Sequence, residues 1–542
     1  MLARQASLLE LESTELVVSK TDVPVTVSQP LSLSHRPGER QSSIPTVLTL
    51  STPISFHLIR QLSVVPPAGD LPAATPEGVC ARRERHGKIG VLKSSVNGAS
   101  MNTASLKSPG QVSVSDKMDR LADAQILPSV EEVLAATPFI DIHTHLYPPS
   151  FGKIGLWGID ELLTYHYLEA ELFRSSHIKP EKYWALSKRE QADLIWQTLF
   201  VENTPVSEAC RGVISVLNEF HLPTDRSDLS EARSFFNAQS VESHVEKVLE
   251  MAGISTVVMT NDPLDPVESA AWMKGVASHP QFLAVLRLDR ILCTWSAHWQ
   301  VLASQGYQVD EHASGKSAAE VRRFLLDWHK RMNAVYMAVS LPDTFAYPQE
   351  TVGNRLLKEA VLPACRELGI PLSLMIGVRK LVNPALRLAG DAAGRSDLRA
   401  LENLCLAFPD NRFLVSVLSR ENQHELCVYA RKFNNLMPFG CWWFLNNPSI
   451  VEEITRERLE MLGTSFIPQH SDARVLEQVI YKWKNTRRTL APILSNSYRL
   501  LLHDGRGVTR SDIQRDITRL FRTNAESWIG APNLASRAPT QV

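Results

Sequence analysis

The chain has 542 residues, of which 44% are hydrophobic and 21% charged, so it can bury a large core. Its formal net charge of -1 provides no overall basic field that would recruit nucleic acid or an acidic lipid surface. No apolar run approaches the roughly 18 residues of a membrane span, so we expect a cytoplasmic protein that binds neither nucleic acid nor a membrane.

Residues 1–117 contain no Trp or Tyr and a single Phe, Phe56. Such a segment has few large side chains to offset the entropy of ordering it. We therefore expect a disordered N-terminal extension over 1–117, a main domain over 118–531, and a short tail over 532–542. The seven cysteines are scattered and form no C-x-x-C pair, which argues against a disulfide framework and favours a reducing compartment; they are Cys80, Cys210, Cys293, Cys365, Cys405, Cys427 and Cys441.

Eight short apolar, β-branched or aromatic runs follow, separated by longer segments with helical patterns. Continuous apolar runs of this kind are typical of parallel strands covered by helices on both faces. Eight such units indicate an α/β fold, a (β/α)8 or TIM barrel, although a doubly wound open sheet would use the same residues. The runs are FIDIH (139–143), TVVMT (256–260), FLAVLR (282–287), VYMAVS (335–340), LSLMI (372–376), FLVSVL (413–418), FGCWWF (439–444) and SFIPQ (465–469).

The first connection of this barrel, at about 146–255, is far too long for one helix. It contains IDELLTYHYLEAELFR, whose apolar residues fit a helical period, so we expect an inserted helical subdomain. After the last run, the segments beginning VLEQVIYKW and DIQRDITRL are predicted to be terminal helices that pack on the barrel.

His143 and His145 lie at the end of the first run, and Asp472 and Arg474 follow the last one in PQHSDAR. Residues two apart on a strand point the same way, and the first and eighth strands of a closed barrel are neighbours. Two imidazoles and a carboxylate could therefore bind one divalent metal and leave positions open for a substrate. The alternatives are a structural histidine cluster and an Asp472 that caps the next helix.

Cations and aromatic residues follow other runs, and guanidinium groups pair well with carboxylates. An anionic substrate is therefore expected. VYMAVS has no lysine that could form a bridging carbamate, and LSLMI and FLVSVL have no histidine, so a single metal or none remains. The cations and aromatics are Arg287, Arg379, Lys380, Arg420, Trp442 and Trp443.

The order of these motifs resembles the uronate isomerase (glucuronate isomerase) family, a branch of the amidohydrolase superfamily, over roughly residues 119–531. DIHTHL resembles the H-x-H strand of that family, and YHYLEAELFR resembles its His-Tyr helix. FGCWWF is similar to its Trp-Trp-Phe segment, and SDAR to its Asp-x-Arg after strand eight. TNDPLDPVES, LRLDR and FRTNAESW add weaker matches.

The resemblance implies a metal held by His143, His145 and Asp472, with Asp472, His166, Tyr167 and Arg474 as catalytic residues. Two departures stand out: the family's strand-five histidine falls on Met375, a weak ligand that carries no proton, and the acidic-His pair after strand four is reduced to SLPD. The predicted substrate-binding residues are Arg287, Trp442, Arg379 and Asp343.

The implied activity is aldose-ketose isomerisation of hexuronates through an enediol, D-glucuronate to D-fructuronate and also D-galacturonate to D-tagaturonate, in glucuronate catabolism. One divalent metal, with zinc as the expected ion, would assist the isomerisation, although the chemistry does not strictly require a metal. The partner is a small-molecule sugar acid, and homo-oligomerisation is left open. The alternatives are a mononuclear amidohydrolase acting on a carboxylated substrate and a degenerate barrel that binds a sugar acid without turnover.

Overall fold

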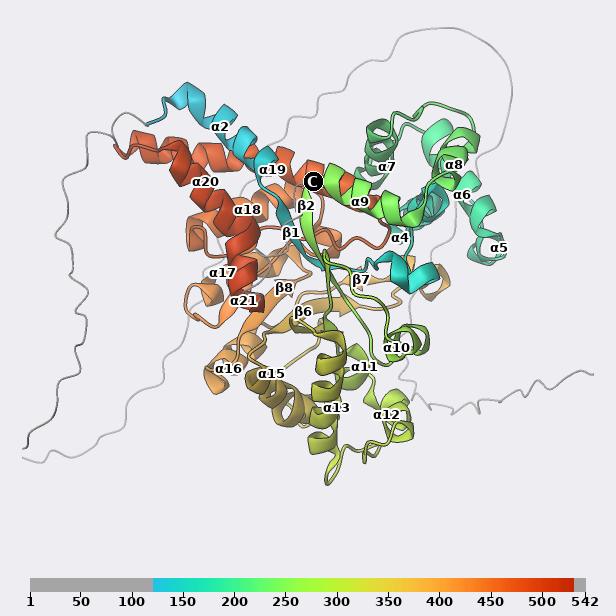
Figure 1. Cartoon of the computed structure of the whole chain (residues 1–542), viewed down its shortest axis with the longest axis vertical. Helices are drawn as coiled ribbons and strands as arrows, with labels where there is room; N and C mark the ends of the chain where they lie inside the picture. The colour runs from blue at the N-terminus through green and yellow to red at the C-terminus, as the bar shows by residue number, and fades with distance from the viewer. Residues whose placement is uncertain (1–119, 531–542) are drawn as a thin grey trace, which may run out of the picture. The chain divides into compact units, whose positions relative to one another are not determined.

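The structure, a computed structural model, describes residues 120–530, so the predicted extension over 1–117 and tail over 532–542 lie outside the described residues. Within them, parallel strands form two sheets with helices packed around them (Figure 1). The first sheet has the order β1 (Phe139–Thr144), β2 (Ile254–Met259) and β3 (Phe282–Leu283). The second has the order β4 (Leu286–Arg287), β5 (Met337–Pro342), β6 (Leu372–Arg379), β8 (Phe413–Val417) and β9 (Leu436–Pro438), with β7 (Ala392–Ala393) antiparallel to β6.

Backbone hydrogen bonds connect the two sheets at Asn261, directly after β2. The Asn261 N–H donates to the Val285 carbonyl at 3.0 Å, and the Arg287 N–H donates to the Asn261 carbonyl at 2.8 Å. The parallel pairing thus continues from β2 into β4 with only a local interruption.

Parallel pairing also continues beyond β9, where Ile467 forms a bridge with Phe439. The Ile467 N–H donates to the Pro438 carbonyl at 3.0 Å, and the Gly440 N–H donates to the Ile467 carbonyl at 2.9 Å. The segment after Ile467 therefore lies along the edge of the second sheet.

The same segment then reaches the end of β1. The Asp472 N–H donates to the His143 carbonyl at 3.1 Å, and the His145 N–H donates to the Ala473 carbonyl at 2.8 Å. The carboxyl ends of the first and last parallel segments are neighbours, as the sequence predicted.

Three of the predicted strands are wrong in detail. The last run, 465–469, forms only the single bridge at Ile467. The run 282–287 is not one strand but β3 and β4, which pair in different sheets. The run 439–444 is not a strand either, because Gly440 adopts a positive φ of 65° that ends the extended chain, and Trp443 begins a short 3-10 helix. Aromatic residues favour strands, and here that preference shifted the predicted strand beyond its true position in β9.

The long connection between β1 and β2 is helical. Its helices include one that begins with a capping box, in which Ser187 and Glu190 each accept a hydrogen bond from the other's backbone N–H. These helices are η1 (Pro149–Ile154), α3 (Ile159–Leu163), α4 (His166–Ser175), α5 (Pro180–Trp184), α6 (Lys188–Trp196), η2 (Gln197–Val201), α7 (Glu208–Glu219), α8 (Ser230–Asn237) and α9 (Val241–Ala252).

The other helices lie between the strands and at the two ends of the described chain, where α2 packs beside the long helix α19 (Figure 1). They are α2 (Asp123–Ala136), α10 (Pro266–Met273), α11 (Asp289–Leu292), α12 (Trp295–Ser304), α13 (Ser317–Met332), α14 (Val352–Leu356), η3 (Leu357–Val361), α15 (Leu362–Leu368), η4 (Pro384–Gly390), α16 (Arg399–Ala407), η5 (Arg420–Asn422), α17 (Gln423–Ala430), η6 (Trp443–Leu445), α18 (Pro448–Leu462), α19 (Gln478–His503), α20 (Arg510–Thr518), η7 (Arg519–Thr523) and α21 (Asn524–Ile529). Across residues 120–530, none of the helices combines the length and apolar character that a membrane crossing requires.

Candidate active site

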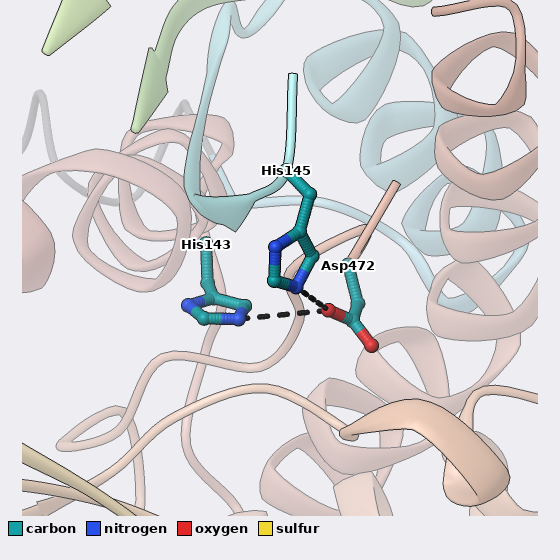
Figure 2. A group of neighbouring side chains, drawn as sticks. All are labelled: His143, His145 and Asp472. Carbon is teal, nitrogen blue, oxygen red and sulfur yellow. Dashed lines mark ion pairs between the residues drawn. The ribbon is translucent and has the colours of Figure 1, made fainter. Parts of the chain in front are cut away.

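His143, His145 and Asp472 meet where the first and last parallel segments end (Figure 2). Oδ1 of Asp472 lies 3.5 Å from Nε2 of His143 and 3.3 Å from Nε2 of His145. The three ligand atoms all lie within 4.8 Å of one another. The H-x-H spacing produces this geometry because alternate residues of a strand point to the same face.

The electrostatics of this group suit a cation. Burial and the nearby Arg474 lower the pKa of His145 to about 3, so its imidazole is neutral at physiological pH and keeps a free lone pair. Burial alone would raise the pKa of Asp472, but the neighbouring imidazoles of His143 and His145 hold it well below its usual range. Two imidazoles and an ionised carboxylate form a donor set that divalent zinc accepts.

Asp472 does not cap the following helix, so that alternative is wrong. The N-cap of α19 is Glu477. Asp472 instead has a left-handed backbone with φ of 51°, a conformation that costs energy in residues with a Cβ and that concentrates at functional sites. Its place is set by the backbone hydrogen bond to His143 described above.

A cavity opens over the group, and it contains six of the predicted site residues: His143, His145, Arg287, Trp442, Asp472 and Arg474. Six other residues line it. Lys380 and Trp443 are among the cations and aromatics expected at the strand ends, whereas the other four had no predicted role. The additional lining residues are Ser340, Val378, Lys380, Leu388, Asp391 and Trp443.

Arg287 lies at the end of β4 and is held by a carboxylate of the protein. Its Nε and Nη2 donate to the two oxygens of Asp289, each at 2.9 Å. The Ser340 N–H also donates to Asp289, at 3.4 Å. The guanidinium is therefore fixed in direction, and part of its charge is already balanced.

His166 and Tyr167, at the start of α4, lie behind the cavity wall and do not line it. The Trp443 indole N–H donates to Nε2 of His166 at 3.0 Å. Nδ1 of His166 and the Tyr167 hydroxyl are buried and have no hydrogen-bond partner within residues 120–530. Burial, then Arg474, lowers the pKa of His166 well below its usual value, and burial raises that of Tyr167.

Arg379 and Asp343, both predicted to bind substrate, lie outside the residues that line the cavity. They approach each other, with Nε of Arg379 at 3.8 Å from Oδ2 of Asp343, and the Arg379 side chain is 54% exposed. Val378 and Lys380 face the cavity, so the residue between them faces away. Strict alternation from Met375 would turn Arg379 inward, but Gly377 has a φ of 121° and the register between β5 and β6 shifts at the same point, which moves the inward face by one residue.

His470 was present in the quoted motif PQHSDAR but received no role. It is fully buried, its ring lies 5.1 Å from that of His143, and neither ring nitrogen has a hydrogen-bond partner in the described part of the chain. Burial, then His143, lowers its pKa well below the usual value, so the ring is neutral. Its spacing of two residues from Asp472 was the available signal.

Met375 lies on β6 in register with Ser340 of β5 and Ser416 of β8. Residues in register on parallel strands face the same side, so Met375 points to the same side of the sheet as Ser340, which lines the cavity. Its side chain is 1% exposed. Within residues 120–530, the candidate ligands thus come from the first and last parallel segments and not from β6.

No protein-family model matches the chain, and no curated protein sequence matches it. Among solved structures, an uronate isomerase from Bacillus halodurans is 48% identical, covering 77% of this chain and 99% of its own, with a TM-score of 0.75. An uronate isomerase from Thermotoga maritima is 14% identical, covering 77% of this chain and all of its own length (100%), with a TM-score of 0.63. A glucuronate isomerase from Caulobacter crescentus is 15% identical over 76% of this chain and 95% of its own, with a TM-score of 0.62; at this identity the last two show a shared fold.

Proposed function

The chain belongs to the uronate isomerase family, and from this premise we propose that it interconverts aldose and ketose hexuronates. The observation that carries the proposal is the 48% identity across 99% of the Bacillus halodurans uronate isomerase chain. The proposed pairs are D-glucuronate with D-fructuronate and D-galacturonate with D-tagaturonate. The cavity with its cations and its triad of His143, His145 and Asp472 supports this activity.

We also propose that the two sheets belong to one closed barrel. The hydrogen bonds at Asn261, Ile467 and Asp472 support a single closed (β/α)8 barrel over residues 118–531, with the helices between β1 and β2 as an insertion. In such a barrel, catalytic groups gather at the carboxyl ends of the strands, where the triad lies.

One divalent ion, zinc, is the proposed cofactor. Oδ1 of Asp472 is buried without a conventional hydrogen-bond donor, and both Nε2 atoms face it, so this residue set fits a metal. His143, His145 and Asp472 would hold it. When bound, the ion supplies a Lewis acid that stabilises negative charge on a substrate oxygen.

Aldose-ketose isomerisation moves a proton between C2 and C1 and needs a base, a proton donor and a group that stabilises the oxyanion. Asp472 is the proposed base: Oδ1 faces the imidazoles, which leaves Oδ2 for the proton from C2. The Arg474 guanidinium lines the cavity and has no ion-pair partner in the described chain, so it is free to bind the enediol oxygen.

His166 is the proposed proton relay. Because Nε2 accepts the Trp443 N–H, the ring proton of the neutral imidazole must reside on Nδ1, which makes Nδ1 a donor. The raised pKa of Tyr167 keeps its phenol protonated, so it would act as a donor and not as a base.

The test is turnover by the purified full chain with D-glucuronate and D-galacturonate, followed by NMR for the ketose product. Ketose formation that disappears in Asp472→Asn is the expected result. Failure of every hexuronate, together with hydrolysis of a carboxylated lactone or amide, would favour the mononuclear hydrolase. Binding without either reaction would favour the non-catalytic alternative.

Location in the cytoplasm and assembly into a homo-oligomer remain predictions. All six described cysteines are free, and five of them are buried, which suits a reducing cytoplasm. Homo-oligomerisation is open to a sedimentation measurement on the full chain.

A further inference from the structure

Three cations line the cavity over the triad: Arg287, Lys380 and Arg474. They are not equivalent. Arg287 is bound to Asp289 through two hydrogen bonds of 2.9 Å, and Arg474 lies beside the triad, close enough to affect the pKa of His145. Lys380 has neither an ion pair nor a hydrogen bond among residues 120–530. Lys380 and Arg474 are therefore the two lining cations without an ion pair among these residues, and Arg474 is already placed at the reacting end of the cavity, beside the triad.

Lys380 follows β6 and belongs to the wall opposite β1. The strand order places β5 and β6 in the middle of the larger sheet, away from the junction of the last segment with β1. Lys380 lies near the Arg287–Asp289 pair, since Arg287 and then Lys380 both help to lower the pKa of the partly buried Asp289 carboxylate. Two cations, Arg287 and Lys380, and two carboxylates, Asp289 and Asp391, lie at this wall. Asp289 is paired with Arg287, and Asp391 accepts the Leu381 N–H at 2.7 Å, so the Lys380 ammonium has no carboxylate partner of its own in the described part of the chain.

We propose that Lys380, with Arg287, binds the carboxylate of the substrate and so sets the preference for sugar acids over neutral sugars. This inference rests on the proposed function. The opposite end of the open-chain sugar, with C1 and C2, would then lie at Asp472 and Arg474, where the proton is moved. Lys380 is exposed at the cavity mouth, so the charged end of the sugar stays near solvent while the reacting end is buried.

The neighbouring Arg379 cannot take this role. Lys380 and Val378 line the cavity because residues two apart on a strand share a face, and Arg379 lies on the other face. Its side chain is 54% exposed and approaches Asp343. The two residues carry the same charge, are adjacent in sequence and differ in direction, so each is a control for the other.

The experiment measures ligand binding by calorimetry in the full chain and in Lys380→Met, Lys380→Arg and Arg379→Met. The probes are L-gulonate, which keeps the carboxylate of glucuronate but carries an alcohol at C1, and neutral D-glucitol. An ion pair near the surface is worth about 1 kcal/mol, so we expect the Kd of L-gulonate to rise about fivefold to tenfold in Lys380→Met. Lys380→Arg should recover part of that loss, and Arg379→Met should bind as the parent does.

D-Glucitol binding should be equal in all four proteins, and the loss with L-gulonate should shrink at high salt. Unchanged L-gulonate affinity in Lys380→Met, or an equal loss in Arg379→Met, would overturn the inference. In turnover, Lys380→Met should raise KM for the hexuronate and leave kcat within about twofold, because the carboxylate contact is the same in the ground and transition states. A parent protein that binds L-gulonate through Lys380 but forms no ketose would refute the proposed function and keep the carboxylate site.

Discussion

The indole N–H of Trp443 donates a hydrogen bond to Nε2 of His166 at 3.0 Å, and both side chains are buried. This contact joins the loop after β9 to the first turn of α4, across 277 positions of the sequence. Trp443 keeps it despite a left-handed φ of 45°. A strained residue that fixes the tautomer of a buried imidazole beside a cavity points to function more than to packing.

Trp443→Phe tests this contact. Phenylalanine preserves the aromatic ring but removes the donor, so Nε2 of His166 loses its partner and the proton is no longer fixed on Nδ1. We expect kcat to fall about tenfold or more, as is usual for a disturbed general acid. The melting temperature should drop by only a few degrees, because one hydrogen bond is worth about 1 kcal/mol.

The tautomer of His166 should be read directly by nitrogen-15 NMR of the imidazole. Trp442→Phe is the control, since Trp442 lines the same cavity but makes no bond to His166. A tautomer that is the same in Trp443→Phe as in the parent protein would refute this role for Trp443.

The role of His143, His145 and Asp472 as metal ligands can be tested by substitution. His145→Ala should lower bound zinc, measured by elemental analysis after dialysis, because it removes one of the three ligands. Asp472→Asn should lower kcat by at least about 10²-fold with little change in melting temperature. An Asp472→Asn protein with normal zinc content and normal turnover would show that the triad is structural.

Much of the fold follows from the sequence because parallel strands buried on both faces must be continuous apolar runs. FIDIH became β1, and LSLMI lies inside β6. The strand after helix α17 was misplaced, since Gly440 turns the chain before the Trp pair and nothing in an aromatic run announces a positive φ. Ile467 forms a single bridge with Phe439, and the alternation of residues around Ile467 does not indicate where this pairing begins or ends.

The site was predictable to the extent that it depends on alternation along one strand. His143 and His145 follow from their spacing, and Asp472 from the expected adjacency of the first and last strands, which the Asp472–His143 backbone hydrogen bond confirms. Lys380 and Arg379 were not separable, because a shift of one residue in the strand exchanges the two faces. The Trp443–His166 bond is a tertiary contact between an insertion and a loop, which no periodicity encodes.

A buried His-Glu pair anchors the insertion. Nε2 of His244 on α9 lies 2.8 Å from Oε1 of Glu477, which also accepts the Gly158 N–H at 2.9 Å, and both side chains of the pair are fully buried. We expect Glu477→Ala to lower the free energy of unfolding by about 3–5 kcal/mol, because it strands a buried imidazole and a backbone donor. Glu477→Gln, which keeps an acceptor, should cost less in urea unfolding.

Adding His244→Ala to Glu477→Ala should cost less than the sum of the two single changes, as expected for residues that share one interaction. Additive losses would show that the two residues act independently.

Glu268 should make stability depend on pH. It is 4% exposed, and burial raises its pKa to about 7 despite hydrogen bonds from the Asp262 N–H, Asn261 and Tyr147. A carboxyl whose pKa is higher in the folded than in the unfolded state favours folding fully at pH below about 4.5 and loses that contribution as the pH rises through about 7. Relative to Glu268→Gln, the parent should lose up to about 1.4 kcal/mol per pH unit in this window.

The measurement is urea unfolding of both proteins from pH 5 to pH 8. Glu460→Gln on the exposed face of α18 is the control and should follow the parent at every pH. A parallel pH dependence for the parent and Glu268→Gln would contradict the assignment.

Alanine at Gly440 and at Gly463 distinguishes the cost of backbone strain from the effect of displacing His470. It has a positive φ of 65°, and a Cβ there would lie 1.8 Å from Cδ2 of the buried His470, whereas Gly463 has a φ of 61° with no atom within 4 Å. Gly463→Ala should therefore lose only the backbone cost of about 1–2 kcal/mol. Gly440→Ala should lose a further 1–3 kcal/mol or so from overpacking. His470 is two residues from Asp472, and its ring lies edge-on to that of His143 at 5.1 Å. Gly440→Ala should therefore also lose most of its turnover, measured per folded molecule after correction for unfolding. Equal stability and equal turnover in the two alanine variants would mean that His470 moves aside freely, and that the ring does not support the triad.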